Sequence, residues 1–283
     1  MKQPLISVAL ITYNQVDFVR ETLDGILSQE RTNFDLEIVA GDDCSTDGTG
    51  DVISDYRSKF PDIIRISERK SNLGMHGNWE ATIADCKGDF IAIIEGDDRW
   101  DDPKKLQKQL DLLTENPTAS ACFSNAKVLK EDGTFSDYDY VDRWAMNLYA
   151  DQFFTLNFNP IPTCTLLFRA EHFSGFPKAY HESPFADWIL HTLLIQKGDY
   201  VYLNECSSAY RQHGGGVWSG VQKERQFTNK LKALNIISGM VRKEFKPLVA
   251  SATKKQMDDL LYFYREEGET VKYFRTWIKL KLA

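Results

Sequence analysis

The sequence has no excess of positive charge. Its 283 residues include 34 lysines and arginines against 41 aspartates and glutamates, which gives a formal net charge of −7 and a pI near 5.4. Proteins that bind nucleic acid over a broad surface carry a basic patch or stripe. We therefore expect no nucleic-acid partner.

Long apolar runs are also missing. No segment approaches the roughly 20 apolar residues that a membrane-spanning helix needs. Residues 1–4 lead directly into the apolar run Leu5–Ile11, without the longer apolar core and cleavage site of a secretory signal. These absences predict a protein that is soluble or bound to a membrane surface.

Cysteine is scarce and lacks a paired pattern. The five cysteines are widely separated, odd in number and without Cys-x-x-Cys spacing: Cys44, Cys86, Cys122, Cys164 and Cys206. A disulfide framework normally shows an even number of cysteines at close spacing. Reduced thiols in a cytoplasmic protein are therefore the simplest prediction.

The first hundred residues alternate between short apolar runs and amphipathic segments. Such alternation is typical of a parallel sheet with crossover helices. With 42% hydrophobic residues the chain can bury one main α/β domain with additions. The patterns predict strands at residues 5–11, 36–40, 63–66 and 90–95, and helices at residues 16–29, 51–60 and 78–86.

The pattern becomes more varied after residue 100. It predicts helices at residues 104–115, 144–156 and 186–196, and strands at residues 119–130, near Phe135, and at residues 163–168, 200–203 and 207–211. From Val221 onward the chain is predicted to be helical, with a break near Lys246-Pro247. No repeat or low-complexity linker separates these parts, so the boundary is predicted near Val221 from the change of pattern.

One predicted strand ends in a cluster of carboxylates, Glu95-Gly96-Asp97-Asp98. Adjacent aspartates repel each other unless a cation, hydrogen-bond donors or protonation relieves the charge. Mg²⁺ or Mn²⁺ prefers oxygen ligands and leaves positions open for substrate phosphates. Ligands of open α/β sheets bind at the carboxyl ends of the strands. The alternative is a solvated turn that caps the helix beginning near Asp102-Pro103.

Four separated segments combine into a more specific pattern. They are Thr12-Tyr13-Asn14, the stretch from Asp42 to Thr49, Glu95-Gly96-Asp97-Asp98 and Phe185-Ala186-Asp187-Trp188. Together they resemble the family 2 glycosyltransferases, inverting enzymes that use nucleotide sugars and have a GT-A fold. The resemblance covers approximately Ile6 to His213.

This resemblance implies a particular architecture. It implies an α/β, Rossmann-like GT-A fold with a mixed, mostly parallel central sheet and a C-terminal helical extension. Residues 1–220 form the catalytic domain in this prediction, with a nucleotide-binding part at about 1–100 and an acceptor-side part at about 101–220. Residues 221–283 form the helical extension.

The resemblance also implies a donor site. Tyr13 would stack on the nucleotide base, with packing beneath the first turn as the equal alternative. Asp43 would accept a hydrogen bond from N3–H of uracil or thymine, with Asp42 as its neighbour, although Asp43, Ser45 or Thr46 could instead cap the next helix. Three residues of the following loop, Asn72, Gly74 and Asn78, would contact the donor through amides or a close backbone approach.

The acidic cluster resembles the metal motif of the family, with Glu95 in place of the usual first aspartate. Asp98 is the principal expected ligand of Mn²⁺ or Mg²⁺, and Asp97 is a contributor to the metal or to the donor sugar. The later segment Tyr210-Arg211-Gln212-His213 resembles another family motif. It implies that His213 is a metal ligand and that Arg211 binds phosphate.

Asp187 is the expected catalytic base by the same resemblance. A carboxylate at the start of an acceptor-side helix could deprotonate the attacking hydroxyl. The family often has a second acid just before this aspartate, where this chain has Ala186. The glycines at positions 214–216 lack the spacing of a phosphate loop and are interpreted as a mobile lid.

The end of the chain mixes cations with large apolar side chains between Lys272 and Leu282. Such a helix could lie on a membrane surface that carries a lipid-linked acceptor. It could equally pack on the domain and leave its lysines in water. Both interpretations stay open at this level.

These features favour a metal-dependent inverting transferase that moves a sugar from a UDP or dTDP donor to a hydroxyl of a glycan or lipid-linked glycan. Bacterial surface-polysaccharide assembly at the inner face of the cell membrane is the expected setting. A nucleotidyltransferase is an alternative, but it usually needs a glycine-rich triphosphate loop that Thr12-Tyr13-Asn14-Gln15 does not offer. A non-catalytic nucleotide- or glycan-binding module is the third hypothesis, and it does not require both Asp98 and Asp187.

Overall fold

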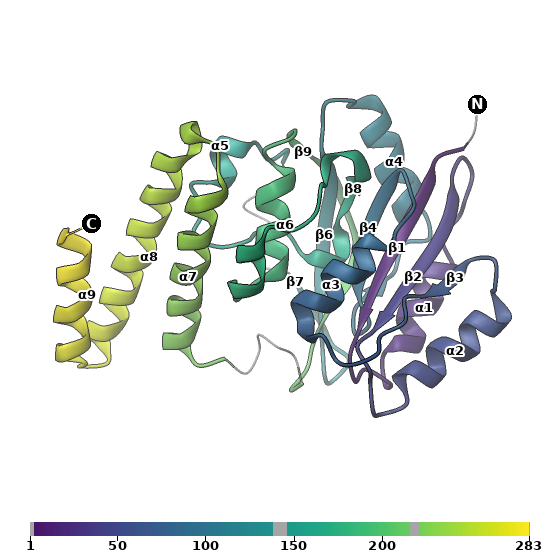
Figure 1. Ribbon diagram of the computed structural model, residues 1–283, viewed down its shortest axis with the longest axis horizontal. Helices are drawn as coiled ribbons and strands as arrows, with labels where there is room; N and C mark the ends of the chain where they lie inside the picture. The colour runs from purple at the N-terminus through teal and green to yellow at the C-terminus, as the bar shows by residue number, and fades with distance from the viewer. Residues whose placement is uncertain (1–2, 138–145, 216–220, 283) are drawn as a thin grey trace. The chain divides into compact units, whose positions relative to one another are not determined.

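The computed structural model describes residues 3–137, 146–215 and 221–282 (Figure 1). Its contacts divide the chain into two compact units, each discontinuous in sequence. The first comprises Met1–Leu148, Pro160–Pro177 and Lys197–His213, and the second comprises Tyr149–Asn159, Lys178–Gln196 and Gly214–Ala283. The second unit therefore joins the helical region after Val221 to two earlier segments.

The first unit is built on a mixed sheet. In the described residues it has nine strands in the order β3-β2-β1-β4-β8-β6-β9-β5, with β7 paired to β6. The first four strands along the chain run parallel to one another: β1 (Leu5–Thr12), β2 (Asp35–Asp42), β3 (Ile64–Ile66) and β4 (Phe90–Glu95). The others are β5 (Arg99–Trp100), β6 (Ala121–Lys130), β7 (Phe135–Asp137), β8 (Leu167–Arg169) and β9 (Tyr200–Gln212). Antiparallel β8 joins β4 to β6, which makes the sheet mixed.

Helices cover both faces of the parallel strands. Alternate residues of β1, namely Ile6, Val8 and Leu10, belong to a core that also contains buried side chains of α1 (Val19–Leu27), α2 (Thr49–Lys59) and α4 (Lys105–Glu115). Helix α3 (Gly74–Ala84) contacts β1 and β2 and buries Trp79 and Ile83, which are not members of that core cluster. The alternation follows from the period of two in a strand.

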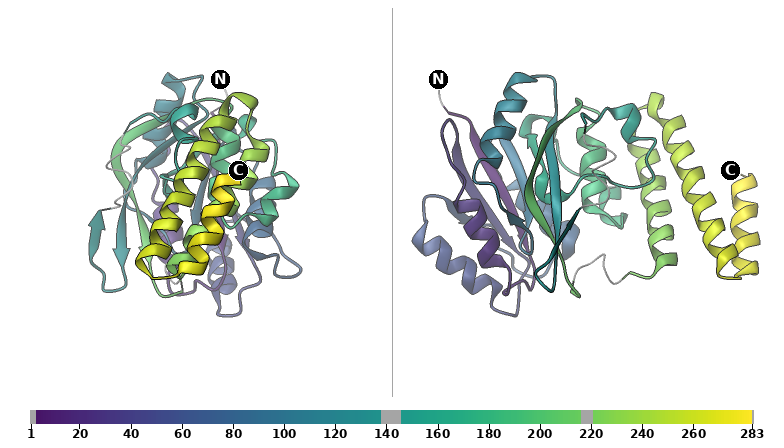
Figure 2. Two further views of the ribbon diagram at one scale, coloured as in Figure 1. Left: turned by 90° about the vertical axis from the view of Figure 1, so that its left-hand side faces the viewer. Right: turned by 180° about the vertical axis from the view of Figure 1, so that it is seen from behind.

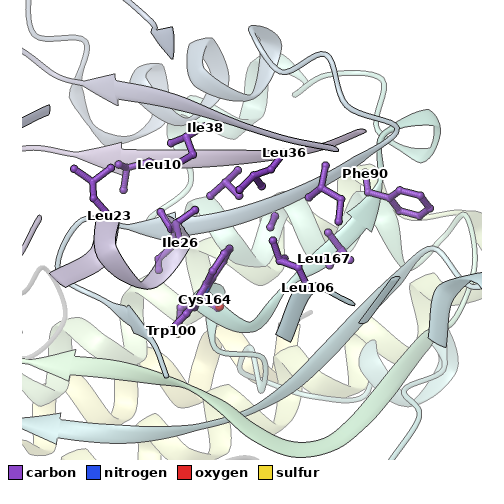
Figure 3. Packing of buried hydrophobic residues seen from close by; sticks show 14 of the residues in the cluster. Leu10, Leu23, Ile26, Leu36, Ile38, Phe90, Trp100, Leu106, Cys164 and Leu167 are labelled. Carbon is purple, nitrogen blue, oxygen red and sulfur yellow. Dashed lines mark hydrogen bonds between the residues drawn. The ribbon is translucent and has the colours of Figure 1, made fainter. Parts of the chain in front are cut away.

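Figure 3 shows part of this core, in which Leu10 of β1, Leu23 and Ile26 of α1 and Trp100 of β5 gather beneath the sheet. Leu23 and Ile26 are fully buried. Burial of such a side chain contributes roughly 1.5–3 kcal/mol. The apolar face of α1 therefore fixes the helix against the strands that carry the acidic cluster.

Two predictions for the first unit need correction. The predicted strand at residues 163–168 is a 3-10 turn at Thr163–Thr165 followed by the short strand β8. The predicted pair of strands between residues 200 and 211 is the single strand β9, whose pairing with β6 shifts register near Asn125. That irregularity absorbs the polar residues that suggested a break.

The second unit is helical in its described part. It contains α5 (Ala150–Phe153), α6 (Ala186–Leu194), α7 (Lys223–Met240), α8 (Lys246–Glu266) and α9 (Thr270–Leu282), and Figure 2 shows the last three side by side. The predicted helix at residues 144–156 shortens to one turn, and Trp144 lies outside the described residues. The predicted break falls at residues 241–245, because Pro247 occupies the first turn of α8, where its missing N–H is tolerated. None of the described helices is long and apolar enough to cross a membrane.

Candidate functional site

Three polar segments meet at one edge of the sheet in the first unit. Strands β2, β1 and β4 are neighbours, and their register pairs Thr12 with Asp42 and Ile11 with Glu95. Chain order reverses between β1 and β4, which is the position where open α/β sheets bind ligands. The predicted donor and metal segments are therefore brought to one edge.

The acidic turn after β4 is held from below by α1. The hydroxyl oxygen of Thr22 lies 2.9 Å from the carbonyl oxygen of Gly96 and 2.7 Å from that of Asp98. Gly96 is required here, because a Cβ at this position would lie 2.6 Å from the Thr12 side chain. Gly25 similarly lets α1 approach Trp100, whose carbonyl oxygen would lie 2.8 Å from an added Cβ. The turn is therefore rigidly placed.

Asp98 is buried, with an exposed fraction of 1%. Its Oδ1 accepts a hydrogen bond of 2.9 Å from the backbone N–H of Arg211, whereas its Oδ2 is buried without a hydrogen-bond partner. Burial raises the pKa of this carboxyl well above its usual value, and the charges of Asp97 and Glu95 raise it further. A cation at Oδ2 would relieve both the missing partner and the repulsion.

Asp97 points to a different partner. Its Oδ2 lies 2.9 Å from Nε2 of His213, the residue just after β9. The His213 ring also packs against Phe18 of the loop before α1, with ring centroids 4.8 Å apart. The structure thus pairs Asp97 with His213, and Asp98, the third predicted metal residue, follows Asp97 in the same turn.

Arg211 is held at several points. Its Nε donates to the carbonyl oxygen of Asp97 at 2.8 Å, and its Nη2 donates to Glu21 of α1 at 2.7 Å. The guanidinium lies over the Phe18 ring, 4.8 Å from its centroid. Glu21 also accepts a longer contact of 3.4 Å from Arg99. In this structure Arg211 therefore ties β9 to α1 and to the acidic turn.

These residues suit a hard divalent cation whose remaining coordination positions are filled by the substrate. Within the described part of the chain, no three His, Cys, Asp or Glu side chains form a preformed metal-binding group. Mg²⁺ is commonly held by one or two carboxylates together with waters and substrate phosphates. Asp98 offers an unpartnered oxygen, and Asp97 and His213 offer a second carboxylate and an imidazole, so the donor set suits Mn²⁺ or Mg²⁺.

The loop after β1 presents Tyr13 to solvent. Tyr13 is 51% exposed, so packing beneath the first turn is excluded. The next residue, Asn14, has a φ of 52°, and its backbone N–H donates to Ser45 at 2.8 Å. The Asn14 side chain in turn accepts the backbone N–H of Thr46 at 2.9 Å. Tyr13 is therefore displayed on a loop that the segment after β2 holds in place.

The two aspartates after β2 have different surroundings. Asp42 accepts hydrogen bonds from the hydroxyl of Thr12 at 2.9 Å and from the backbone N–H of Ser45 at 3.0 Å. Asp43 is buried, and its Oδ1 accepts the backbone N–H of Leu73 at 2.7 Å. Neither aspartate caps the following helix with its side chain, because α2 has no side-chain cap. The capping alternative therefore does not apply to Asp43.

The loop before α3 folds back on Asp43. The Asn72 amide donates to the carbonyl oxygen of Asp43 at 3.0 Å, and its Oδ1 accepts the N–H of Gly74, which has a φ of 73°. Asn78 is only 1% exposed, and its amide donates to the carbonyl oxygens of Gly41 and Thr12. In this structure Asn78 braces two strand ends instead of facing solvent.

A pocket of about 300 Å³ opens beside the end of β2. Asp42, Cys44, Ser67 and Arg69 are among its lining residues, while Asp43 is not. The Arg69 guanidinium donates to Asn78 at 3.1 Å and to Thr82 at 2.7 Å, and its burial lowers its pKa. Arg69 therefore presents a fixed positive group at this end of the sheet.

Asp187 belongs to the second unit. It lies in the first turn of α6, and its Oδ1 accepts the backbone N–H of Trp188 at 2.7 Å. Its Oδ2 accepts the side-chain amide of Asn159 at 2.7 Å. Burial raises the pKa of this carboxyl, and the two hydrogen bonds oppose that shift. The group is thus a carboxylate held by uncharged donors, which suits a proton acceptor.

Sequence reasoning missed several residues of these clusters. Phe18, Glu21 and Arg69 contact the predicted residues in the first unit, and Asn159 contacts Asp187 in the second. Phe18 and Glu21 are three residues apart just after a loop that was singled out, which is a usable signal on a helix. For Arg69 and Asn159 the sequence offers no such signal.

The chain is similar to a known family and to several known proteins. One family, described as Glycosyl transferase family 2, matches residues 7–182. An uncharacterized protein of Mycobacterium tuberculosis is 31% identical over 277 residues, which cover 96% of this chain and 73% of the relative. TuaG of Bacillus subtilis, named as a candidate teichuronic acid biosynthesis glycosyltransferase, is 28% identical over 229 residues, covering 80% of this chain and 86% of TuaG.

Solved structures show a similar fold. Mannosyltransferase PcManGT from Pyrobaculum calidifontis, in complex with GDP-Man and Mn²⁺, has a TM-score of 0.65 at 16% identity, covering 100% of this chain and 82% of PcManGT. TarS of S. aureus in complex with UDP-GlcNAc has a TM-score of 0.59 at 16% identity, covering 96% of this chain and 90% of that chain. At this identity the likeness concerns the fold alone.

Proposed function

Since this chain belongs to glycosyl transferase family 2 and has the GT-A fold, we propose that it is a metal-dependent inverting transferase. It moves a sugar from a UDP or dTDP donor to a hydroxyl of a glycan or lipid-linked glycan. The family assignment sets aside the nucleotidyltransferase and the non-catalytic binding module. The observation that carries the metal dependence is the buried Oδ2 of Asp98, which has no hydrogen-bond partner in a cluster of carboxylates.

On the donor side, Tyr13 stacks on the base and Asp43 accepts the N3–H of uracil or thymine, with Asp42 lining the neighbouring pocket. The exposure of Tyr13 and the anchoring of Asn72 and Gly74 on the Asp43 segment support this assignment. Stacking on an aromatic ring binds any base, whereas a fixed carboxylate selects a base with an N–H donor. The proposal therefore predicts selectivity for uracil or thymine.

On the metal side, Asp98, Asp97 and His213 hold Mn²⁺ or Mg²⁺, and Arg211 contributes positive charge near the diphosphate. A bound cation supplies Lewis-acid stabilisation of the charge that develops on the leaving diphosphate. The complex of PcManGT with GDP-Man and Mn²⁺ supports a divalent cation in this fold. Asp97 and His213 form a contact of 2.9 Å, so both side chains are already directed into one cluster.

In the transfer step, the Asp187 carboxylate removes the proton of the acceptor hydroxyl. The hydroxyl oxygen forms a bond to the anomeric carbon, while the bond between that carbon and the diphosphate oxygen breaks. The nucleotide diphosphate leaves with the bonding electrons. The raised pKa of Asp187 supports this role, because a base works best when its pKa approaches the operating pH.

We further propose surface-polysaccharide assembly at the inner face of the cell membrane, which the name of TuaG supports. Helix α9 contains four lysines or arginines and no acidic residue. Val271, Phe274 and Trp277 are exposed and recur every third residue, so they share a helix face. Such a face suits insertion at the surface of an anionic membrane.

A donor screen tests the proposed function. Purified protein is incubated with individual UDP-, dTDP- and GDP-sugars and a glycan acceptor mixture, with Mn²⁺, Mg²⁺ or EDTA, and the released nucleotide diphosphate is measured. We expect release from a uridine or thymidine donor that stops with EDTA. Equal release with EDTA would exclude metal dependence, and nuclear magnetic resonance of the product would test inversion at the anomeric carbon.

A vesicle sedimentation experiment tests the membrane contact separately. The intact chain is expected to sediment with anionic phospholipid vesicles and to stay in solution with zwitterionic ones. A chain without residues 272–283, and the variant Phe274→Ser, should bind less. Absence of binding by the intact chain would reject this part of the proposal and leave the transferase activity unaffected.

A further inference from the structure

Asp187 is held by a second residue that no sequence motif marks. Asn159 donates a hydrogen bond of 2.7 Å from its side-chain amide to Oδ2 of Asp187. The other carboxylate oxygen accepts the N–H of Trp188 at 2.7 Å. One donor is part of the helix backbone and comes with α6, whereas the other depends on the identity of residue 159. Of the two donors, the side-chain donor is therefore the one that a substitution can remove.

The position before Asp187 is apolar and buried. Ala186 is buried, with an exposed fraction of 3%, where the related enzymes often have a second acid. A longer charged side chain here would be taken out of water, which is costly without a partner. Asn159 supplies Asp187 with a polar partner from a different segment of the chain.

The segment that carries Asn159 is itself anchored. Asn157 is 6% exposed, and its amide donates to Oε1 of Gln256 at 2.8 Å and to Oδ2 of Asp259 at 2.9 Å. Gln256, on α8, is also buried and donates to the carbonyl oxygen of Phe227 on α7 at 3.3 Å. These contacts run from the two long helices to the loop, two residues before Asn159. All of them lie within the second compact unit.

We infer that Asn159 is a positioning residue for the catalytic carboxylate, fixed by a polar anchor of Asn157 on α7 and α8. The inference rests on the proposed role of Asp187 as the base. It assigns a task to the helical region that sequence reasoning placed outside the catalytic domain. Helices α7 and α8 hold the loop, the loop holds Asn159, and Asn159 orients Asp187.

The side chain that faces the Asp187 carboxylate has to be an uncharged hydrogen-bond donor. An amide N–H stabilises the ionised carboxylate and fixes its orientation without introducing a competing charge. An aspartate of the same size at position 159 would remove the donor and place two carboxylates in contact. Like charges at this distance favour protonation of one member of the pair. A protonated Asp187 could not act as a base.

Two variants of Asn159 test the inference with the donor identified by the nucleotide release screen. Asn159→Ala removes the donor and should lower kcat by about tenfold, because the carboxylate loses a charge-assisted hydrogen bond. Asn159→Asp keeps the size and should lower kcat further, by about a hundredfold. The KM for the donor should stay within about twofold of the wild type in both variants, because Asp187 acts on the acceptor.

The order of the two variants separates positioning from packing. If residue 159 only fills space, the isosteric Asn159→Asp is tolerated better than Asn159→Ala, and the inference is overturned. Wild-type kcat in both variants overturns it as well. Asp187→Asn, measured in parallel, reports on the base itself. Full transfer by Asp187→Asn overturns the base and this inference together, whereas loss of transfer in Asp187→Asn alone overturns only the inference.

Thermal unfolding gives a readout that does not depend on activity. Asn159→Asp should lower the Tm by about 3–6 °C, because the two carboxylates repel each other. The double variant Asn159→Asp with Asp187→Asn again places one amide opposite one carboxylate, and its Tm should return toward the wild type. Transfer should stay absent in the double variant. Independent, additive Tm changes in the double variant would overturn the contact on which the inference rests.

Discussion

Asp98 and Asp187 are both poorly exposed carboxylates whose pKa burial raises, yet their neighbours differ. Asp98 lies among like charges, with Asp97 and Glu95 adding to the shift, and one of its oxygens has no hydrogen-bond partner. The pKa of Asp187 is raised by burial with no like charge contributing, and hydrogen bonds from Asn159 and from backbone N–H groups oppose the shift. Asp98 also has opposing donors, the backbone of Arg211 and the Cys164 thiol, so the difference lies in the like charges. In the proposed mechanism a cation completes the first environment, and the second holds a carboxylate that accepts a proton. Neighbours, more than burial, therefore separate the two roles.

The proposed difference between Asp98 and Asp187 would be wrong if neutralising Asp187 had no effect on transfer. Asp187→Asn should reduce kcat by about a thousandfold, within the range that general base catalysis contributes. The KM for the donor should change little. Steady-state kinetics of nucleotide diphosphate release checks this, with Asp151→Asn as the control, an exposed aspartate of the same unit. Transfer at the wild-type rate would remove Asp187 from the mechanism.

The second prediction concerns the crowded carboxylate. Asp98→Asn should lower metal-dependent turnover by about a hundredfold, because a neutral amide binds a divalent cation far more weakly than a carboxylate. The Tm without metal should stay equal or rise, since the change removes like-charge repulsion. Asp111→Asn, an exposed aspartate on α4, is the matched control. Unchanged metal titration curves would contradict the assignment.

A smaller effect is expected from the contact that holds Arg211. Glu21→Gln weakens the 2.7 Å contact with the Arg211 guanidinium, and Glu21 is half exposed, so the contact is worth at most about 1 kcal/mol. We expect an increase of up to about fivefold in the KM for the donor, with kcat less affected. Glu115→Gln, exposed at the end of α4, is the control. An effect on kcat alone would argue that Glu21 does not act through Arg211.

The last prediction concerns stability instead of turnover, as a pH dependence in the second unit. His191, one turn after Asp187 on α6, is buried, and burial lowers its pKa to about 3. The unfolded chain binds a proton at this histidine below about pH 6.5 while the folded chain does not, so stability falls as the pH falls toward 3. From pH 7 to pH 5 the loss is about 2 kcal/mol.

The variant His191→Gln should lose this acid sensitivity. The control variant His181→Gln, which changes an exposed histidine, should keep it. Denaturant unfolding at pH 5 and pH 7 measures the difference for each protein. An unchanged slope in His191→Gln would show that another group carries the acid sensitivity. Because His191 stays neutral across this range, it adds no charge beside Asp187, which sharpens the contrast with the crowded Asp98.

Much of the fold could be predicted from local patterns. The strand at residues 90–95 was predicted with the bounds that the structure gives, and the GT-A fold is confirmed. Periodicity worked there because each strand buries alternate residues whatever its neighbours are. It was less accurate at residues 163–168, which form a 3-10 turn and the start of the short strand β8, and at the described residues 146–156, where the helix is limited to α5.

In the candidate site, the residues that lie in sequence motifs could be predicted, whereas their remote partners could not. Tyr13, Asp43, Asp98 and Asp187 occur in ordered motifs, and the sequence alone assigns them to separate segments after strands or at a helix start. Their partners are remote in sequence: Arg211 and Glu21 are 190 residues apart, and Asn159 and Asp187 are 28 apart. No local pattern encodes such pairs, because a remote contact depends on how the chain is connected.

By itself, the sequence determined the apolar strands, the order of the acidic motifs and the family they belong to, since each is written in neighbouring residues. Only the tertiary structure decided that Asp98 is buried beside Arg211, that Asn78 braces strand ends, and that α7 and α8 anchor the loop of Asn159. The physical reason is that hydrogen bonds and desolvation act through space. Patterns among neighbouring residues therefore do not show which remote residues come together.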